Sequence, residues 1–289
     1  MTLQGQPAPA GRRCAVLGHP VGHSLSPVLH GAAYAALGMD DWRYEVHDVT
    51  EETLGAFLDG LDASWAGLSL TMPLKHAVLP LLDHVEPLAQ VVGAVNTVLP
   101  QGEGARRVLT GANTDVHGIV AALGEAGVVG GVRRAAVLGA GATAASTLAA
   151  LAQLGCTTPT VHLRSAGRAG ALLRAAHRMG VEPVLRPLEA TAPELAAADV
   201  VVSTLPAHAP DALADALAGP VRGVLLDVVY DPRPTALAQA WERAGGRTVG
   251  GERMLLHQAV EQVRLMTGRT APVDAMDAAL QAALTPVAG

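Results

Sequence analysis

The sequence predicts an α/β fold of two domains, one of them built on a parallel sheet with helices on both faces. The chain has 289 residues, which is long for a single hydrophobic core. From residue 134 onward, short Val/Leu runs alternate with Ala/Leu-rich helical patterns. Such alternation is typical of buried parallel strands linked by helices. A Gly-x-Gly-x-x-Ala segment follows the first of these runs, and turns of this kind join strand to helix in doubly wound sheets.

The composition supports a folded protein that binds neither nucleic acid nor membranes. Half of the residues are hydrophobic, 16% are charged and the net charge is −6. With only one Phe, three Tyr and three Trp, the chain lacks the aromatic platforms and the basic surface on which single-stranded nucleic acids stack. No apolar stretch approaches the roughly 20 residues of a spanning helix, and the N-terminus lacks a signal peptide's apolar run. We therefore expect a cytoplasmic protein.

Cysteines and histidines indicate neither disulfides nor a metal. Cys14 and Cys156 form no framework, and we expect both to be buried free thiols. The eleven histidines show no ligand spacing with a carboxylate or cysteine partner, so no metal site is predicted.

The first half contains short aliphatic strands, each followed by a helical pattern. The first strand, 14–18, ends in Gly18 and leads into a segment rich in Gly, Pro and Ser. A helix is expected over 28–37, with Ser26 as its N-cap and Pro27 in its first turn. The remaining expected elements are strands at 43–46, 66–71 and 94–99, helices at 51–61 and 74–82, and a polar hairpin or loop over 100–111.

The second half repeats a strand–helix pattern. A helix is expected over 116–126 before residues 128–134, which separate the two halves. The expected strands of the second half lie at 135–138, 160–163, 184–186, 200–203 and 224–228. The last helix is expected over 254–266, with an apolar stripe formed by Leu255, Ala259, Val263 and Met266.

A dinucleotide-binding fingerprint lies at the first strand of this half. In Gly139-Ala140-Gly141-Ala142-Thr143-Ala144 the first glycine permits a tight turn and the second lets the backbone approach a pyrophosphate. The small final residue lets the helix pack closely on the strand, and the helix N-terminus offers N–H donors. The context favours a Rossmann-type dinucleotide domain, and the alternative is a tight turn without a ligand.

The end of the next strand favours NADP over NAD. An NAD site usually has an acidic residue there, whereas this chain has Arg164, Ser165 and Arg168 and no carboxylate. Guanidinium groups bind a phosphate through paired charge-assisted hydrogen bonds. We predict that these residues bind the 2'-phosphate of NADP; the alternative is solvated surface charge.

Four polar clusters in the first half are difficult to explain as scaffold. They are Gly18-x-Pro-x-x-His-Ser24-Leu-Ser26-Pro, Gly67-Leu-Ser-Leu-Thr71-Met-Pro-Leu-Lys75, Gly93-Ala-Val-Asn96-Thr97 and Gly111-x-Asn-Thr-Asp115-x-x-Gly118. Hydroxyl, amide and charged groups in glycine-flanked turns suit a substrate with several hydroxyl groups.

Together with Asp227-Val-Val-Tyr230-Asp-Pro232 and Gly250-Gly-x-x-Met254-Leu-x-x-Gln258-Ala259, these motifs resemble the shikimate dehydrogenase family along essentially the whole chain. The resemblance implies an N-terminal α/β substrate domain over 1–113, completed by 251–289. It also implies a Rossmann-type NADP domain over 114–250 and a C-terminal helix that returns to the first domain. The implied reaction is the reversible NADPH-dependent reduction of 3-dehydroshikimate to shikimate, on the pathway to chorismate and aromatic amino acids. The implied assembly is a monomer or a homodimer.

The resemblance also assigns roles to single positions. Lys75 and Asp115 match the catalytic pair, and Ser24 and Ser26 match the serines that bind the substrate carboxylate. The groups that match ring-hydroxyl ligands are Thr71, Asn96, Asp115 and Gln258, and Tyr230 matches a tyrosine near substrate and nicotinamide. Beside the fingerprint and the arginine segment, the implied cofactor contacts are Thr204, Val228 and Gly251.

Three departures leave substrate and cofactor breadth open. Ser69 stands where the family often has Asn, Leu163 where Asn precedes the phosphate-binding Arg, and Ala142 where a glycine is common. One alternative is a quinate or aminoshikimate dehydrogenase using NAD or NADP. Another is a sensor that binds NADP(H) without turnover, although a sensor has no need of an acid–base pair such as Lys75 and Asp115.

Overall fold

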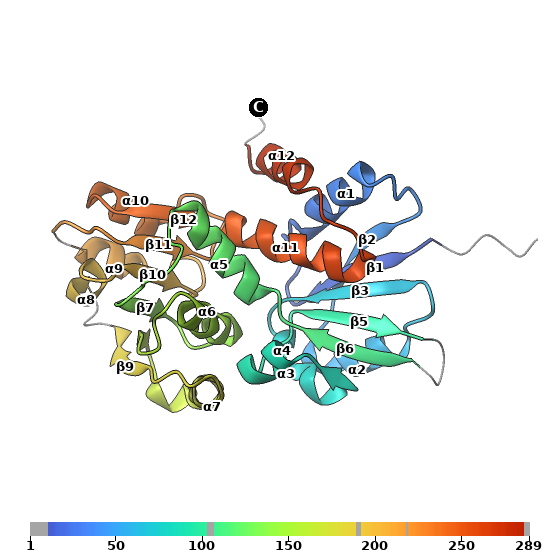
Figure 1. The fold of residues 1–289 in the computed structure, drawn as a ribbon, viewed down its shortest axis with the longest axis horizontal. Helices are drawn as coiled ribbons and strands as arrows, with labels where there is room; N and C mark the ends of the chain where they lie inside the picture. The colour runs from blue at the N-terminus through green and yellow to red at the C-terminus, as the bar shows by residue number, and fades with distance from the viewer. Residues whose placement is uncertain (1–10, 103–106, 189–191, 218, 286–289) are drawn as a thin grey trace, which may run out of the picture. The chain divides into compact units, whose positions relative to one another are not determined.

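The computed structural model describes residues 11–102, 107–188, 192–217 and 219–285. These residues pack into two compact units. Unit 1 comprises Met1–Val85, Val95–Ala112 and Gln262–Gly289, and unit 2 comprises Glu86–Ala94 and Asn113–Glu261. Each unit contains one six-stranded sheet, so the predicted α/β class with two sheets is confirmed (Figure 1).

The sheet of unit 1 is mixed and has the strand order β2-β1-β3-β5-β6-β4. Three strands at one side are parallel, β1 (Arg13–Gly18), β2 (Arg43–Asp48) and β3 (Trp65–Leu70). At the other side, β5 (Thr97–Gln101) runs antiparallel to both β3 and β6 (Val108–Ala112), and the short β4 (His84–Val85) pairs with β6. The predicted hairpin after β5 is therefore present. The C-terminal ends of β1 and β3 and the start of β5 share one edge.

Helices α1 (Ser26–Ala36), α2 (Glu51–Asp59), α3 (Leu74–Ala77) and α12 (Val273–Leu284) complete unit 1. The helix α12 lies beside α1 (Figure 1), so the C-terminal segment packs on the first unit. The helix predicted over 74–82 is shorter, because a 3₁₀ turn at Leu79–Leu81 replaces its second half. Pro80 explains this break, since proline lacks the N–H that an α-helix needs there.

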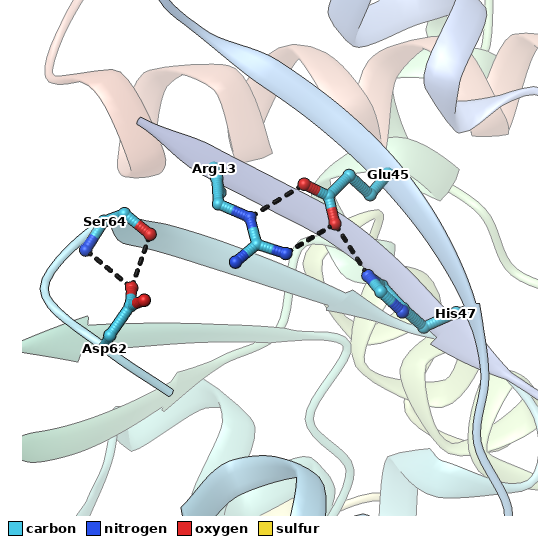
Figure 2. A network of polar contacts seen from close by, with 5 residues as sticks. All are labelled: Arg13, Glu45, His47, Asp62 and Ser64. Carbon is cyan, nitrogen blue, oxygen red and sulfur yellow. Dashed lines mark hydrogen bonds and ion pairs between the residues drawn. The ribbon is translucent and has the colours of Figure 1, made fainter. Parts of the chain in front are cut away.

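A polar cluster joins the edge strand β2 to its neighbour β1 (Figure 2). Arg13 on β1 donates to both carboxylate oxygens of Glu45 on β2, at 2.8 and 2.9 Å. Nε2 of His47 lies 2.8 Å from the same carboxylate, and the Arg13 guanidinium stacks 4.2 Å from the centroid of the Trp65 ring. The hydrogen bond from Arg13 lowers the pKa of Glu45 to about 2. The carboxylate therefore stays ionised over the whole neutral range.

The sheet of unit 2 is entirely parallel and has the order β12-β11-β10-β7-β8-β9. Its strands are β7 (Ala135–Leu138), β8 (Thr160–Leu163), β9 (Val184–Pro187), β10 (Val200–Ser203), β11 (Val224–Asp227) and β12 (Arg247–Gly250). The chain reverses its direction of winding between β7 and β10. Ligands of doubly wound sheets bind at the carboxyl ends of the strands at this switch point.

Helices cover both faces of this sheet. They are α4 (Pro87–Val92), α5 (Asp115–Glu125), α6 (Ala142–Gln153), α7 (Gly170–Met179), α8 (Ala192–Ala196), α9 (Asp211–Ala216), α10 (Ala236–Arg243) and α11 (Gly251–Thr267), whose last residues belong to unit 1. Ala135 and Val137 contribute to one buried core, whereas Ala136 and Leu138 contribute to a second. Because neighbouring strand residues point to opposite faces, these are the cores on the two sides of the sheet.

The two compact units are defined by packing, whereas the predicted domains are defined by the ligand that their residues bind. Packing places Glu86–Ala94 and the first part of α11 with unit 2, whereas the functional division puts 1–113 and 251–289 in one domain and 114–250 in the other. That functional division stays a prediction. Among the described residues, no helix combines the length and apolar character needed to cross a membrane.

Both cysteines are free and buried, as expected. Burial raises the pKa of the Cys14 thiol to about 12, so this thiol stays protonated and unreactive near neutral pH.

Candidate active site

The shared strand edge of unit 1 brings the predicted substrate residues together. The Thr71 N–H donates to the Leu17 carbonyl at 2.9 Å, and the His19 N–H donates to the Met72 carbonyl at 3.0 Å. A Cβ atom at Gly18 would overlap the Thr71 side chain. Glycine is thus required at the end of β1 so that the polar segment after it can lie against Thr71.

The two predicted carboxylate-binding serines lie at the start of α1. Ser26 is buried and is the first residue of the helix, with Pro27 after it. The prediction that Ser26 is the N-cap is wrong, because Leu25 has that position and the Ser24 hydroxyl accepts from the Ser26 N–H at 3.3 Å. Ser24 therefore helps to satisfy the helix start, a role that a hydroxyl two residues upstream can fill.

Asn96 and Lys75 are joined to the same edge through the backbone. The Asn96 carbonyl accepts from the Leu70 N–H at 2.7 Å, and the Lys75 carbonyl accepts from the Val95 N–H at 2.9 Å. The Asn96 side chain is buried, whereas Lys75 is half-buried on α3. Thr71, Lys75 and Asn96 consequently occupy one small region of unit 1.

Beneath this region lies a chain of buried polar side chains. Tyr44 donates to Ser69 at 2.6 Å, and Ser69 donates to Oε1 of Gln262 at 2.8 Å. Nε2 of Gln262 donates to the Thr97 hydroxyl at 3.1 Å, and Thr97 donates to Oδ1 of Asn96 at 2.9 Å. His30 stacks on Tyr44 with ring centroids 4.0 Å apart. Burial lowers the pKa of His30 to about 3, so its ring is neutral.

The fingerprint of unit 2 has the geometry that its sequence predicts. Gly139 has φ 107°, which strains any residue with a side chain. A Cβ atom there would also lie 2.5 Å from the Thr204 hydroxyl oxygen. Thr204 follows β10 and donates its side chain to the Leu138 carbonyl at 2.8 Å. At the start of α6, Gly141 is exposed and has open space beside its Cα, so a ligand can approach the backbone there.

The arginine segment follows β8 directly. Arg164 and Ser165 are both exposed. Arg168 lies in a 3₁₀ turn, Ala166–Arg168, but its side chain falls outside the part of the chain that the structure describes. Leu163 is buried in the core at the end of β8. Thus the position before Arg164 holds a packing residue, and the polar groups of the segment begin at Arg164.

The segment after β11 approaches the start of α11. A Cβ atom at Gly251 would overlap the Val228 carbonyl, so glycine permits this backbone contact. Burial raises the pKa of Asp227, the last residue of β11, while its carboxylate accepts from the Thr235 hydroxyl at 2.8 Å. Tyr230 is half-buried in the same segment. Val228 and Gly251 therefore lie side by side in unit 2.

Asp115 and Gln258 also lie in unit 2. Asp115 is buried at the first position of α5, where the helix dipole favours a negative charge. It is not the N-cap, because Thr114 has that position and the Asn113 side chain accepts from the Val116 N–H at 3.2 Å. Oε1 of Gln258 lies 3.5 Å from the Thr114 hydroxyl, and Nε2 of Gln258 donates to the Leu255 carbonyl at 2.9 Å.

Comparisons with known proteins show the family of the chain. The model of the shikimate dehydrogenase substrate binding domain matches residues 16–98, and that of the shikimate 5'-dehydrogenase C-terminal domain matches residues 251–281. A shikimate dehydrogenase (NADP(+)) of Methanothermobacter thermautotrophicus is 38% identical over 276 residues, which are 93% of this chain and 95% of the relative. The chain belongs to the shikimate dehydrogenase family. The family predicted from the motifs is thereby confirmed.

Solved structures of shikimate dehydrogenases have the same fold. The enzyme of Mycobacterium tuberculosis is 41% identical, with a TM-score of 0.83 over 94% of this chain and 99% of that one. The enzyme of Thermus thermophilus in complex with NADP(H) and shikimate is 36% identical, with a TM-score of 0.78 over the same shares of the two chains. These similarities confirm the predicted fold class.

The sequence motifs missed one buried residue of the polar chain that underlies this candidate site. Gln262 lies one helical turn after Gln258 on α11 and is buried. A second polar residue within an apolar helix pattern was the available signal for it. Ser69, where the family often has Asn, is the partner of Gln262. Ala142, another departure from the family pattern, is half-buried at the first position of α6.

Proposed function

We propose that this chain catalyses the reversible NADPH-dependent reduction of 3-dehydroshikimate to shikimate. The observation that carries this proposal is the likeness to relatives named shikimate dehydrogenase (NADP(+)) along more than nine-tenths of the chain. The parallel sheet of unit 2 and the polar strand edge of unit 1 supply regions for a dinucleotide and for a small polar substrate.

NADP fits the residues present in unit 2. The close approach of Gly139 to Thr204 and the open space beside Gly141 leave backbone amides at the start of α6 accessible, and such amides bind a pyrophosphate. Arg164 and Ser165 are exposed. We assign the 2'-phosphate to these two residues and to Arg168. We assign the remaining contacts with the cofactor to Ala140, Ala142, Thr143, Val228 and Gly251. When bound, NADPH supplies the hydride, and the protein orients the reactants.

The substrate is assigned to polar groups from both units. We assign the carboxylate of shikimate to the hydroxyls of Ser24 and Ser26. The ring hydroxyls are assigned to Thr71, Asn96, Asp115 and Gln258, with Tyr230 beside the ring. This assignment is supported by the buried or half-buried state of each of these side chains, since a hydrogen bond to a substrate is stronger when water is excluded.

Lys75 and Asp115 are assigned to the reacting oxygen. Reduction of a ketone needs a proton donor at that oxygen, and an ammonium group also stabilises the alkoxide as its charge develops. A carboxylate beside the ammonium takes up the proton in the reverse direction. We assign the proton transfer to the pair and not to one member.

We further propose that the protein acts in the cytoplasm, as a monomer or a homodimer, on small molecules alone. The net charge of −6 supports the absence of a nucleic-acid partner. Light scattering on the purified protein over a range of concentrations tests the assembly.

A panel of substrates and cofactors tests the proposed function. Initial rates are measured with shikimate, quinate and aminoshikimate, each with NADP and with NAD. The proposal expects the highest kcat/KM for shikimate with NADP. A higher kcat/KM for quinate or aminoshikimate would assign the chain to one of the alternative dehydrogenases. Tight NADPH binding without turnover of any of the three would instead indicate a sensor.

A further inference from the structure

The buried polar chain below the strand edge of unit 1 has a consistent direction of hydrogen bonding. Its fixed point is the backbone carbonyl of Asn96, which can only accept. This carbonyl lies 3.3 Å from Nε2 of Gln262. Because Nε2 must donate to it, the Gln262 amide is oriented with its Oε1 on the opposite side, facing Ser69 and His30. An amide orientation is assigned from such a network of partners.

The orientation of Gln262 determines each neighbouring proton. Oε1 only accepts, so the Ser69 hydroxyl donates its single proton there, at 2.8 Å. The Ser69 oxygen then accepts from the Tyr44 hydroxyl, at 2.6 Å. Nε2 of His30, 3.3 Å from Oε1, must also carry a proton. This is the neutral tautomer that the lowered pKa of His30 allows.

On the other side, the chain reaches the Asn96 side chain. The Thr97 hydroxyl accepts from Nε2 of Gln262 at 3.1 Å and donates its own proton to Oδ1 of Asn96 at 2.9 Å. Thr97 and Gln262 are almost completely inaccessible to solvent, so water does not substitute for either partner. Oδ1 of Asn96 is thereby held on the Thr97 side, and the Nδ2 donor lies at the other end of the amide.

We infer that Gln262 is a positioning residue for the substrate. Through Thr97 it fixes the Asn96 amide, so that Asn96 presents a hydrogen-bond donor to a ring hydroxyl of the substrate, and that hydroxyl accepts. The inference rests on the proposed function for the identity of the substrate and on the hydrogen bonds of unit 1 for its direction. It also gives Thr97 a role, as the hydroxyl that transmits the orientation of Gln262.

The test uses variants that remove the polar atoms and retain the volume. Gln262→Met deletes both the donor and the acceptor of the amide, and Thr97→Val deletes the hydroxyl. Each should raise the KM for shikimate about tenfold, since an Asn amide that is no longer held loses one oriented hydrogen bond. The KM for NADP should stay within about twofold of the wild-type value. The double variant should be no worse than either single variant, because both act through one chain of hydrogen bonds.

A control variant separates positioning from packing. Met266→Leu, on the same helix, changes a buried side chain that packs against Gly67 and conserves volume. It should leave the KM for shikimate unchanged. An unchanged KM in Gln262→Met, equal effects on the KM values of shikimate and NADP, or fully additive effects in the double variant would overturn the inference.

A second readout needs no turnover. In the ligand-free protein, the side-chain amide NMR signals of Asn96, identified by their loss in Asn96→Asp, should shift in Gln262→Met and in Thr97→Val but not in Met266→Leu. Unchanged signals in both test variants would overturn the inference even if the wild type oxidised shikimate. A wild type without activity on shikimate would instead contradict the proposed function, while the NMR result would still decide the direction of the hydrogen-bond chain.

Discussion

Gly118 on α5 and Gln258 on α11 pack so closely that no methyl group fits between them. A Cβ atom at Gly118 would lie 2.9 Å from Cβ of Gln258 and 2.8 Å from the Met254 carbonyl oxygen. Asp115 lies one turn earlier on α5 and is buried. The glycine of the Asn-Thr-Asp-x-x-Gly motif is thus explained by helix contact, a constraint that a turn would not impose.

Gly118→Ala should therefore destabilise the protein and impair the site together. Forcing a methyl group into a filled contact typically costs about 1–3 kcal/mol, and the shift of α5 against α11 displaces Asp115 and Gln258. The melting temperature and the kcat/KM for shikimate should both decrease. The matched control is Gly124→Ala on the same helix, where nothing lies within 4 Å of the new Cβ. It should be neutral or slightly stabilising; equal effects of the two substitutions would contradict the packing argument.

Replacing Ser24 and Ser26 together by Ala should weaken shikimate binding selectively. Hydrogen bonds to a charged group contribute about 1.5–3 kcal/mol each, so the KM for shikimate should rise strongly. The KM for NADP should be nearly unchanged, because both serines lie in unit 1. Since Ser24 also accepts from the Ser26 N–H, thermal unfolding should be measured in parallel. Equal increases in both KM values would indicate damage to the start of α1.

Arg164→Ala should narrow the preference for NADP over NAD. Loss of one charge-assisted contact to the 2'-phosphate costs about 1.5–3 kcal/mol, or about 10–150-fold in affinity. NAD lacks that phosphate, so its affinity should change little. Arg243→Ala, at an exposed arginine near the end of α10, serves as the control and should leave both affinities unchanged. If the wild type binds NAD more tightly than NADP, or if Arg164→Ala lowers the affinities for both cofactors equally, the assignment of this arginine is wrong.

Two groups of unit 1 should make stability decrease on acidification, His30 starting near pH 6.5 and Glu45 only below about pH 4.5. Burial lowers the pKa of His30 from 6.5 to about 3, so below pH 6.5 the unfolded chain binds a proton that the folded chain does not. Stability therefore falls as the pH is lowered from 6.5 toward 3. The Arg13 hydrogen bond lowers the pKa of Glu45 from 4.5 to about 2, so its contribution is lost only between those two values.

Melting temperatures measured from pH 7 to pH 3 can separate the two groups. His30→Gln should flatten the decrease that begins below pH 6.5, and Glu45→Gln should leave that part of the curve unchanged. If the melting temperature of His30→Gln decreases with falling pH as steeply as that of the wild type, the buried ring is not the group that binds the proton.

The sequence predicted the buried strands of unit 2 well. Because a parallel strand is apolar on both faces, the runs at β7, β8 and β10 have the bounds expected from their Val and Leu residues. The edge strand β12 was missed, since Arg247-Thr-Val-Gly250 is only partly buried and carries no such run. The helix α4 was missed as well. The residue pattern gave no bounds for α12, which packs on α1, far away in sequence.

The same distinction holds for the candidate site. Residues in local motifs, such as the Gly139 turn and the Thr71–Lys75 segment, were identified because a short spacing carries their chemistry. The hydrogen bond between Ser69 and Gln262 joins residues separated by 193 positions. A pattern in a short stretch of sequence cannot predict such a distant pair. A glutamine in a helix can lie on an exposed face as well as on a buried one. Only the folded chain reveals that the Gln262 amide and Asn96 are linked.

The central claim is tested most directly by the rate of NADPH formation from shikimate and NADP, measured for the wild type and for Lys75→Ala prepared identically. The parallel preparation reveals any contaminating dehydrogenase of the expression host. A general acid–base group typically contributes about 10²–10⁴-fold to the rate. The account predicts shikimate-dependent NADPH formation by the wild type and a decrease of about that size in Lys75→Ala, with shikimate binding largely retained. Absence of shikimate-dependent NADPH formation by the wild type, or equal rates in the two preparations, would contradict it.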